Sequence, residues 1–537
     1  AAAVADRLGP LAAGFREELA AMRQERSDST SLANDDSRSQ VAYLAGIDAL
    51  QERSQQIFDE EAEHVTMSRA TAIVCAVIGT GLAWLTVRCD LPGRGAFRLL
   101  APLPLVFPSF VGAAALIAGF STGGLVEQLL TPLGIDSLPN VRGFGGAWLV
   151  LTLFTYPYVY LPVAARMRDL PPSLEESARL LGRRPAAVFA SVVLPQVSGA
   201  IWAGVLLVFL YTISDFGAVT LLGYDTLTEQ IYADKLYDQE RAMALSLVLG
   251  GVALLVVAAE RSFDRRRRRV EVIRSSAPLT VALGRWRWPA LVAVAAVLFN
   301  ALVGPVAVLG FWAWRGLTSS VDSIGLGTDV GALVEPTGNS AVVAVVTAGV
   351  AVAVVLPVAW LTARYRSRVG GAANSMVVAG FALPGVVIAL SIVFWVIDAP
   401  LLGRWYQTLP LLIVAYVLHF GAQATRTAHV AVGAVPDRLG DAAATLGAPR
   451  TRRFLTVELP LMTPGLLAGA GLVLLSTLKE LPATLLLAPI GFDTLATEIW
   501  HASDRGALAQ SSLAALVLVA LSCVLTWLVV LRRADRY

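Results

Sequence analysis

The sequence predicts an all-α membrane protein that crosses the bilayer many times, and three observations support this fold class. Hydrophobic residues make up 56% of the 537 residues and charged residues only 15%, with a mean hydropathy of +0.65. A soluble globular protein of average composition is far less apolar. About eleven apolar stretches approach the ~20 residues that a helix needs to cross a bilayer. Finally, a charged stretch between these apolar runs occurs twice.

The expected spans are read from the apolar runs. They lie near residues 70–87, 97–120, 144–165, 200–222, 243–259, 289–313, 341–363, 375–397, 409–425, 464–488 and 511–531. Several contain proline, at Pro104, Pro108, Pro157, Pro384 and Pro410. Neighbouring helices can satisfy the backbone groups that proline frees, so these segments remain candidates.

The repeated stretch is LEESARLLGRRPAAVFASVVLP at 174–195 and LGDAAATLGAPRTRRFLTVELP at 439–460, with every matched pair 265 residues apart. Glycine, at Gly182 and Gly447, permits a left-handed turn at the end of a first short helix. The closing Leu-Pro marks entry to the next segment. Each copy is therefore expected to be two short helices joined by a bend.

Basic residues predict the orientation of the spans. The loops near 88–98, 166–199, 260–288, 364–374, 426–463 and 532–537 hold 28 arginines. The opposite loops hold only Arg142, Lys235, Arg241, Arg315, Arg404 and Arg505. We therefore expect both repeated loops to face the cytoplasm, in halves that are parallel repeats.

The repeat extends beyond the loops and divides the chain. Ala83-Trp84-Leu85-Thr86 matches Ala359-Trp360-Leu361-Thr362 at an offset of 276, which implies eleven extra residues in the first half, expected in the loop 121–143. The predicted parts are a polar helical segment 1–66 of unknown role, a first half 67–260, an arginine-rich cytoplasmic linker 261–287 and a second half 288–537. The linker carries an unbroken run of arginines, which contacts anionic membrane lipid or simply sets the orientation. Binding of nucleic acid is not expected.

The N-terminal segment differs from the rest of the chain. Residues 1–66 hold thirteen acids and six arginines, a net charge of −7, and the apolar spacing predicts a helical hairpin. The segment begins without methionine and shows no signal-peptide pattern, whereas Met67 directly precedes the first apolar run. The natural start of the chain is therefore expected elsewhere than at residue 1.

Both repeated loops resemble the EAA loop of ABC-importer permeases, whose pattern is Glu-Ala-Ala, three residues, Gly, nine residues and Ile-x-Leu-Pro. Here Val192 and Val457 replace the isoleucine. The resemblance implies a type I importer (MetI-like) with two helical bundles, and coupling helices that dock on two ATPase subunits. The coupling residues would be Glu176, Ala178, Gly182, Asp441, Ala443 and Gly447. If the family's six spans per half apply, the first half lacks the counterpart of span 289–313, and residues 1–66 stand in its place.

Charged residues inside the apolar spans form a second repeated pair. Ser214-Asp215 matches Lys479-Glu480 at the same offset of 265. Because intramembrane charges are costly and mark pathways or structural pairs, Asp215 and Glu480 are expected near the symmetry axis, with Lys479 neutralising one of them. They form either a gate or cation path of the translocation route, or a buried ion pair that holds the bundle together.

Other candidate chemistry is weaker. The four histidines, His64, His419, His429 and His501, lack metal-ligand spacing and are expected to be ordinary core or loop residues. Tyr156, Tyr158 and Tyr160 suggest ferric-iron ligands, but only the first and third share a helix face, so packing is expected. No metal site and no cofactor are predicted.

The stretches at 214–232 and 479–500 resemble the fused two-half permeases of ferric-iron importers, which are related to the permeases for thiamine, polyamines and sulfate. The resemblance covers residues 67–537. It implies a multi-pass permease in the bacterial inner membrane, which receives its substrate from an extracytoplasmic solute-binding protein. Acids of the outer loop 223–242 would contact iron or, as we prefer, dock the binding protein. They are Asp225, Glu229, Asp234, Asp238 and Glu240.

Two other classes of function remain open at this point. The chain has no Walker A loop, because Lys235 follows aspartate and Lys479 follows leucine. An importer would thus need separate ATPase subunits, and the chain itself would be no enzyme. A secondary transporter could instead use Asp215 and Glu480 as an ion relay. An arginine-rich membrane scaffold would transport nothing.

Overall fold

A computed structural model describes residues 64–134, 138–235, 237–267, 280–319, 327–365, 368–526 and 528. The chain divides into two compact units, Ala1–Arg69 and Ala70–Tyr537. The hairpin predicted for residues 1–66 lies almost wholly outside the described residues. So does the middle of the predicted linker, while the linker's first residues continue a helix to Arg267. The account below concerns the second unit.

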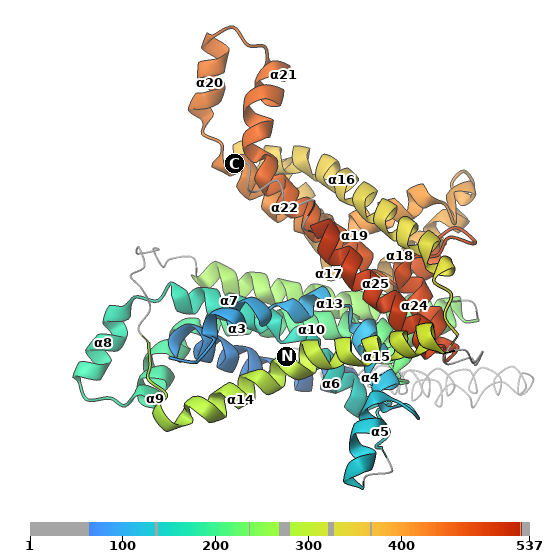
Figure 1. The fold of residues 1–537 in the computed structure, drawn as a ribbon. Helices are drawn as coiled ribbons and strands as arrows, with labels where there is room; N and C mark the ends of the chain where they lie inside the picture. Colours follow the sequence, from blue (N-terminus) through green and yellow to red (C-terminus); the bar gives the residue numbers. More distant parts are fainter. Residues whose placement is uncertain are drawn as a thin grey trace, which may run out of the picture. The chain divides into compact units, whose positions relative to one another are not determined.

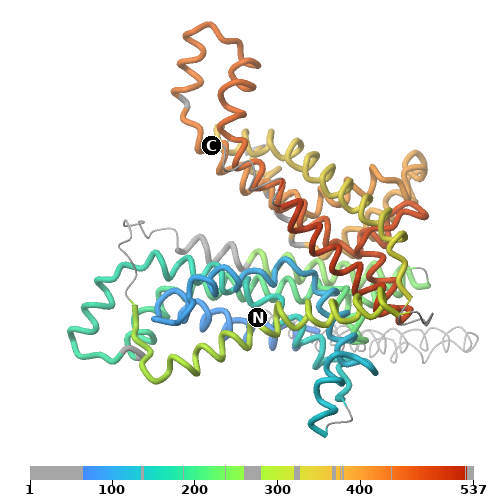
Figure 2. Tube along the Cα trace, viewed as in Figure 1, coloured from blue at the N-terminus to red at the C-terminus, as the bar shows by residue number. Residues whose placement is uncertain are grey.

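The regular elements of the described chain are helices, joined by turns and loops, and an isolated β-bridge links Cys89 and Val281. This confirms the predicted all-α fold. In the first half, a helix spanning His64–Arg88 is followed by the elements shown in Figures 1 and 2. They are α3 (Arg94–Leu100), η2 (Leu103–Val106), α4 (Ser109–Phe120), α5 (Leu125–Leu130), η3 (Thr131–Leu133), α6 (Phe144–Thr155), α7 (Pro157–Arg168), α8 (Pro172–Leu180), α9 (Pro185–Val188), η4 (Phe189–Val193), α10 (Leu194–Ser214), α11 (Gly217–Leu221), α12 (Leu227–Asp234) and α13 (Gln239–Arg267).

The second half repeats this order after one additional long helix. Its elements are η5 (Gly284–Trp286), α14 (Arg287–Leu298), η6 (Phe299–Val303), α15 (Gly304–Thr318), η7 (Gly331–Leu333), α16 (Val334–Arg364), α17 (Arg368–Ala382), α18 (Gly385–Asp398), η8 (Gly403–Trp405), α19 (Leu409–Ala434), α20 (Asp437–Thr445), α21 (Arg450–Arg453), η9 (Phe454–Glu458), α22 (Leu459–Leu478), α23 (Pro482–Leu487), α24 (Leu495–Asp504) and α25 (Leu508–Thr526).

In the described part of the chain, eight helices are long and apolar enough to cross a membrane, or nine if a bent pair counts as one span. Eleven segments were expected. The difference arises partly at proline, because Pro108 bends segment 97–120 by 94° and Pro384 separates α17 from α18 within segment 375–397. Segment 409–425 lies in α19, which is 26 residues long but is not one of these eight helices.

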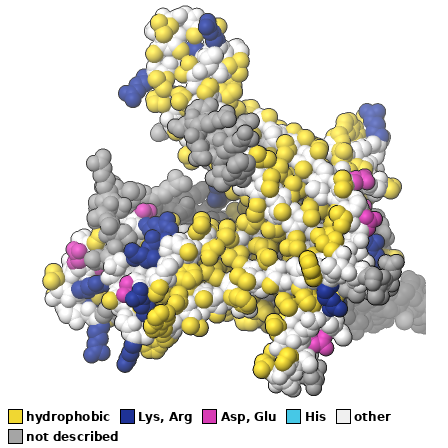
Figure 3. Space-filling model, viewed as in Figure 1, with side chains coloured by type: hydrophobic (Ala, Val, Ile, Leu, Met, Phe, Trp, Pro, Cys, Tyr) yellow, Lys and Arg dark blue, Asp and Glu magenta, His cyan; other side chains and the backbone are white. Residues whose placement is uncertain are grey.

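Apolar side chains cover much of the outer surface, as Figure 3 shows, with charged side chains gathered towards the margins of that face. On α14 to α16, Val292, Phe299, Val303 and Val334 are more than half exposed. In water such a surface would be unfavourable, whereas lipid tails are as apolar as these side chains. The exposed valines and phenylalanine therefore fit a lipid-facing surface.

Each half contributes a long helix that packs against the other half. The last long helix of each half contacts the other half's short helix after the proline break, so α13 packs on α18 and α25 packs on α4. The additional helix α15 also joins them: Trp312 Nε1 donates to the Ala118 carbonyl at 2.8 Å and Arg315 donates to the Gly123 carbonyl at 2.6 Å. Although α15 belongs to the second half by sequence, it packs against both halves.

Candidate functional site: two hairpins and a shared cavity

Each repeated loop folds as a pair of short helices that projects from its own half (Figure 1). Gly182, after α8, has φ +78°, and Gly447, after α20, has φ +79°. In the first copy the Gly182 N–H donates to Arg179 and the Arg183 N–H to Ala178, at 2.9 and 3.2 Å. This is the pair of bonds that closes a Schellman motif. The second copy repeats it, so the predicted bends are confirmed.

The predicted coupling residues lie on these hairpins. Glu176 and Asp441 are exposed, Ala178 is buried and Ala443 is half-buried. The residue just before each glycine, which the sequence pattern does not single out, is strongly exposed: Leu181 is 82% exposed and Leu446 is 88% exposed. Each hairpin thus exposes a large apolar side chain directly before its glycine bend.

The segments that leave the hairpins are π-helical and are anchored in the same way in both halves. Trp84 packs on Phe189, with ring centroids 5.1 Å apart, and Trp360 packs on Phe454 at 5.7 Å. The Ala-Trp-Leu-Thr repeat thus carries an aromatic anchor for the chain that follows each hairpin. As expected, Pro195 and Pro460 then begin the first turns of α10 and α22.

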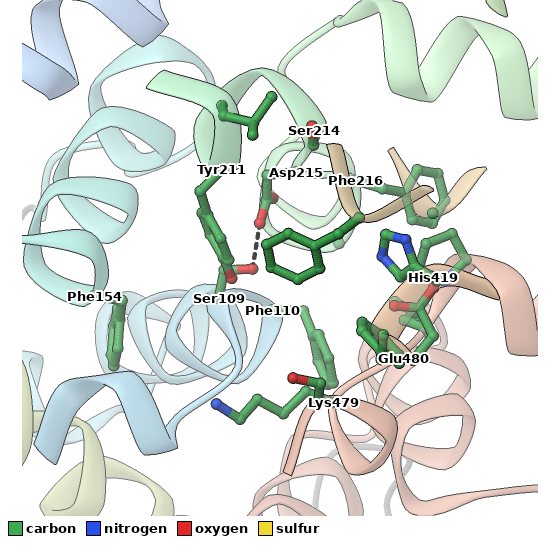
Figure 4. Close-up of a pocket in the computed structure, with 18 of the residues that line it drawn as sticks. Ser109, Phe110, Phe154, Tyr211, Ser214, Asp215, Phe216, His419, Lys479 and Glu480 are labelled. Carbon is green, nitrogen blue, oxygen red and sulfur yellow. Dashed lines mark hydrogen bonds between the residues drawn. The ribbon is translucent and has the colours of Figure 1, made fainter. Parts of the chain in front are cut away.

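A cavity of about 230 Å³ lies between the halves, and Figure 4 shows its lining. Ten of its residues in the first half have their repeat counterparts in the second-half wall. At an offset of 276 these are Leu105/Phe381, Phe107/Leu383 and Ser109/Gly385; at 265 they are Phe154/His419, Tyr158/Gln423, Tyr211/Ser476, Ser214/Lys479, Asp215/Glu480, Phe216/Leu481 and Gly217/Pro482. The cavity is therefore centred on the axis that relates the repeats.

Asp215 and Glu480 line this cavity and play the same local structural part. The Ala218 N–H donates to Asp215 at 3.0 Å, and the equivalent Ala483 N–H donates to Glu480 at 3.1 Å. Each carboxylate thereby caps a short helix, α11 or α23. Ser109 also donates to Asp215.

The longer side chain of Glu480 has room because the second half has no serine at the position equivalent to Ser109. At its place stands Gly385, where an added Cβ would lie 2.6 Å from Glu480 Oε1. A serine there would collide with the carboxylate. Both carboxylates therefore cap a helix in the same way, but Asp215 also accepts a hydrogen bond from the Ser109 hydroxyl, whose place beside Glu480 is taken by Gly385.

The expected partner of Lys479 was wrong. In the described part of the chain its ammonium donates to the Leu105 carbonyl of the first half, not to either carboxylate. The physical reason is the break before Pro108, where Phe107 is extended and no longer continues a helix. A carbonyl at a helix break lacks its intrahelical partner and accepts another donor.

The two halves line the cavity with different polar side chains. In the first half Tyr158 and Tyr211 pack together, with ring centroids 5.6 Å apart. Their counterparts form an amide–hydroxyl pair, in which Gln423 and Ser476 exchange hydrogen bonds of 2.9 and 3.0 Å. His419, expected to be an ordinary core or loop residue, also faces the cavity, packed 4.4 Å from Phe420.

The three neighbouring tyrosines separate as the helical spacing predicts. Tyr156 donates to the Ala101 carbonyl at 2.9 Å, and Tyr160 pairs with Thr86 at 3.2 Å, so both are core residues. Tyr158 occupies the other face and lines the cavity. Among the described residues, no group of three His, Cys, Asp or Glu is placed to hold a metal ion.

The cavity is bounded on one side by an aromatic stack that joins the halves. Phe216 packs on Tyr232 at 4.9 Å and on Trp500 of the second half at 5.3 Å. Tyr232 and Trp500 lie on the matching helices α12 and α24, each capped by a threonine, Thr226 or Thr494. Each helix begins at the leucine of a Gly-x-Asp-Thr-Leu stretch, 223–227 or 491–495, at the predicted outer side.

The outer loop 223–242 carries five acids, at Asp225, Glu229, Asp234, Asp238 and Glu240, against two basic residues, Lys235 and Arg241. Lys235 lies over the Tyr232 ring, 3.3 Å from its centroid, and Arg241 pairs with Asp234 at 3.3 Å. Partial burial, followed by the charges of Asp225 and Asp234, raises the pKa of Glu229. Both cations of the loop are thus engaged locally, and its acids outnumber them.

A helical bundle built from two parallel repeats, with a hairpin on each and a cavity on their axis, defines a two-half membrane permease. The family model described as "Binding-protein-dependent transport system inner membrane component" matches residues 76–269 and 355–534, and the chain belongs to this family. The protein is therefore a multi-pass inner-membrane permease of the ABC-transporter type.

Three curated relatives are also named as permeases of transport systems. The chain is 30% identical over 461 residues to "Fe(3+)-transport system permease protein FbpB 2" of Haemophilus influenzae, covering 84% of this chain and 86% of that protein. It is 32% identical over 201 residues to "Molybdenum transport system permease protein ModB" of Mycobacterium tuberculosis (36% and 74%). It is 32% identical over 151 residues to "Sulfate transport system permease protein CysT" of Escherichia coli (28% and 53%).

Proposed function

We propose that this chain is the permease subunit of an ATP-driven importer that receives ferric iron from a solute-binding protein. The observation that carries the proposal is the similarity to a permease named for Fe(3+) transport, which extends over 84% of this chain. The molybdenum and sulfate relatives are similar only over one half or less. These relatives support the assignment to the importer class, but they do not support iron as the substrate.

The two hairpins would bind two ATPase subunits. Both present an exposed acid, Glu176 or Asp441, and an exposed leucine, Leu181 or Leu446, around the same glycine bend. Identical ATPases need two similar docking elements on the same side of the membrane, and parallel repeats provide them. Movement of the ATPases would pass through the Trp84–Phe189 and Trp360–Phe454 packing into α10 and α22.

The cavity would form part of the translocation route, with Asp215, Lys479 and Glu480 as path or gate residues. A trivalent cation prefers hard oxygen ligands. The described residues offer oxygens from both halves but no three-ligand metal group. The cavity therefore suits brief passage, and selectivity would reside in the binding protein.

The acids of loop 223–242 would dock the binding protein on the outer side. We expect the combined Asp225→Asn and Glu240→Gln variant to need roughly three- to tenfold more binding protein for half-maximal ATPase stimulation at low salt, because complementary charge speeds encounter. The difference should shrink as salt screens the field. Titration of the assembled complex with loaded binding protein measures it.

The matched control is Glu335→Gln. Glu240 and Glu335 are both exposed acids in the first turn of a long helix, α13 or α16. The control removes one charge outside the loop and should leave the titration unchanged. A salt-independent shift, or the same shift in the control, would show that the loop is not the docking rim.

Uptake by the reconstituted complex tests the proposed function. Proteoliposomes that contain this chain, the ATPase and the binding protein should accumulate radiolabelled ferric iron only when ATP is supplied. Thiamine, spermidine, sulfate and molybdate serve as competing substrates. ATP-driven accumulation of one of these, without iron, would change the substrate and keep the importer; uptake driven by an ion gradient without ATP would instead indicate a secondary transporter.

A further inference from the structure

One long apolar helix of the second half lies on the outside of the bundle. η5, α14, η6 and α15 form a continuous helical segment, Gly284–Thr318, which runs along one face of the molecule in Figure 1. Only 22% of its apolar segment is buried, the lowest share among the eight candidate spans of the described chain. Val292, Phe299 and Val303 are 66%, 56% and 53% exposed. This helix therefore presents more of its surface to lipid than the other spans do.

Both ends of this helix carry exposed tryptophan. Trp286 and Trp288 are 62% and 68% exposed at one end, and Trp314 is 70% exposed at the other. Trp288 and Trp314 are 26 residues apart, which is about 40 Å along a helix. A bilayer with its headgroup regions is about 40–45 Å thick, and tryptophan favours both of its interfaces. The helix thus reaches from one headgroup layer to the other, with Trp286 and Trp288 on the predicted cytoplasmic side.

The arginines at the two ends of this helix differ in their contacts. At the outer end, Arg315 donates to the Gly123 carbonyl at 2.6 Å and lies 5.1 Å from the centroid of the Trp312 ring. At the inner end, Arg285 and Arg287 are exposed, and within the described ranges neither has a hydrogen-bond, ion-pair or ring partner. Figure 3 shows basic side chains gathered towards this end of the molecule. The protein itself therefore leaves these two charges to an outside partner.

The backbone that carries these arginines is held in place. The Val281 N–H donates to the Arg88 carbonyl at 2.7 Å, and the Asp90 N–H donates to the Val281 carbonyl at 3.2 Å. The Leu283 N–H donates to Asp90 Oδ1 at 2.8 Å. Residues 281–283 lead directly into η5. The inner end of the outer helix is therefore fixed to the end of the first span.

Arg285, Trp286, Arg287 and Trp288, which we call the inner collar, alternate cation and indole around the start of the helix. Successive helical residues are turned by about 100°, so every side of this turn presents one of them. A guanidinium binds phosphate through its fork of N–H groups, and the cytoplasmic leaflet holds the anionic lipids.

We propose that the inner collar binds the phosphate headgroup of an anionic phospholipid in the inner leaflet. The indoles and the exposed valines that follow favour a lipid over free phosphate, because they would contact its glycerol and acyl region. The bound lipid would hold both the outer helix and the end of the first span at the membrane surface. This inference goes beyond the proposed function and applies whichever substrate is carried.

The test places the full chain in phosphatidylcholine nanodiscs that contain an increasing share of brominated phosphatidylglycerol, which quenches nearby tryptophan. The signal of the collar is the part lost in the Trp286→Phe, Trp288→Phe double variant, and Trp314→Phe gives the signal of the outer end in the same way. We expect the collar to be half-quenched at a roughly fivefold lower share of phosphatidylglycerol than Trp314. Arg285→Gln combined with Arg287→Gln should remove this preference, because each arginine near an anionic surface contributes about a fivefold factor.

The matched control is Arg450→Gln combined with Arg452→Gln. These arginines are also exposed, two residues apart and on the predicted cytoplasmic side, but they belong to the hairpin helix α21. Their loss should leave the quenching unchanged, and an equal shift in this control would overturn the proposal, because only the total charge would then matter. An unchanged preference in the Arg285, Arg287 variant would also overturn it.

A second measurement does not depend on the arginine variants. Brominated phosphatidylcholine, given at the same share, should quench the collar of the otherwise unchanged chain about fivefold less effectively than brominated phosphatidylglycerol. High salt should reduce the difference, because it screens the attraction between arginine and phosphate. Equal quenching by the two lipids at low salt would contradict an anionic-lipid site, even if the glutamine variants failed to insert.

Discussion

Valine at Gly182 or Gly447 is expected to abolish the stimulation of the ATPase by loaded binding protein while leaving the membrane bundle folded. Both glycines have φ near +80°, and an added Cβ at either position would meet nothing within 4 Å. The penalty is therefore conformational, about 1–3 kcal/mol for a residue that disfavours the left-handed region. That cost is enough to unbend the hairpin in most molecules. Copurification of the ATPase and stimulated hydrolysis measure the effect.

Asparagine provides the matched control at the same positions. Because it tolerates the left-handed region better than other residues, Gly182→Asn and Gly447→Asn should retain most of the stimulation. Gly433→Val offers a second control, since that glycine also faces open space but has no positive φ. Full stimulation in both valine variants would contradict the assignment of the hairpins as coupling elements.

Much of the hairpin geometry was predictable because the same residue pattern occurs twice in the sequence. A glycine at the same place in two copies, followed by Leu-Pro at the same distance, indicates a bend and a new helix. The φ values of Gly182 and Gly447 confirm that bend. Leu181 and Leu446 also occur in both copies, but the sequence does not show whether an apolar residue in a polar loop is buried or exposed.

The cavity was only partly predictable. Charge inside an apolar run pointed to Asp215, Lys479 and Glu480, and all three line it. Tyr158 and Tyr211 carry no such signal, because tyrosine is common in apolar cores. Helical spacing separated Tyr158 from its neighbours but could not show that its face meets the axis between the halves.

The partners of buried charges were the least predictable feature. Lys479 donates to the Leu105 carbonyl, which has no helical donor because the helix breaks before Pro108. Only the folded backbone shows that this carbonyl is available. A buried ion pair between Arg88, at the end of the helix His64–Arg88, and Glu175 of α8, with 2.7 Å between Nη1 and Oε1, was hidden for another reason. Comparison of the repeats favours residues that occur in both halves, and Gly440 removes the acid from one of them.

Neutralising the cavity carboxylates by Asp215→Asn or Glu480→Gln is expected to reduce uptake by ~tenfold or more, because intramembrane charges are retained for function. Both amides keep a side-chain oxygen that can accept the N–H of Ala218 or Ala483. The caps of α11 and α23 should survive, so the complex should assemble normally. Initial rates of ATP-driven uptake, at equal amounts of assembled complex, provide the measurement.

Alanine at the same positions separates charge from capping. Asp215→Ala and Glu480→Ala lose both, and the lost cap costs about 0.5–2 kcal/mol of stability, which thermal unfolding of the purified complex would detect. If the carboxylates are caps alone, the amide variants will transport like the unchanged chain and only the alanine variants will be impaired. If they are path or gate residues, the amide variants will be as inactive as the alanine variants while unfolding at the normal temperature.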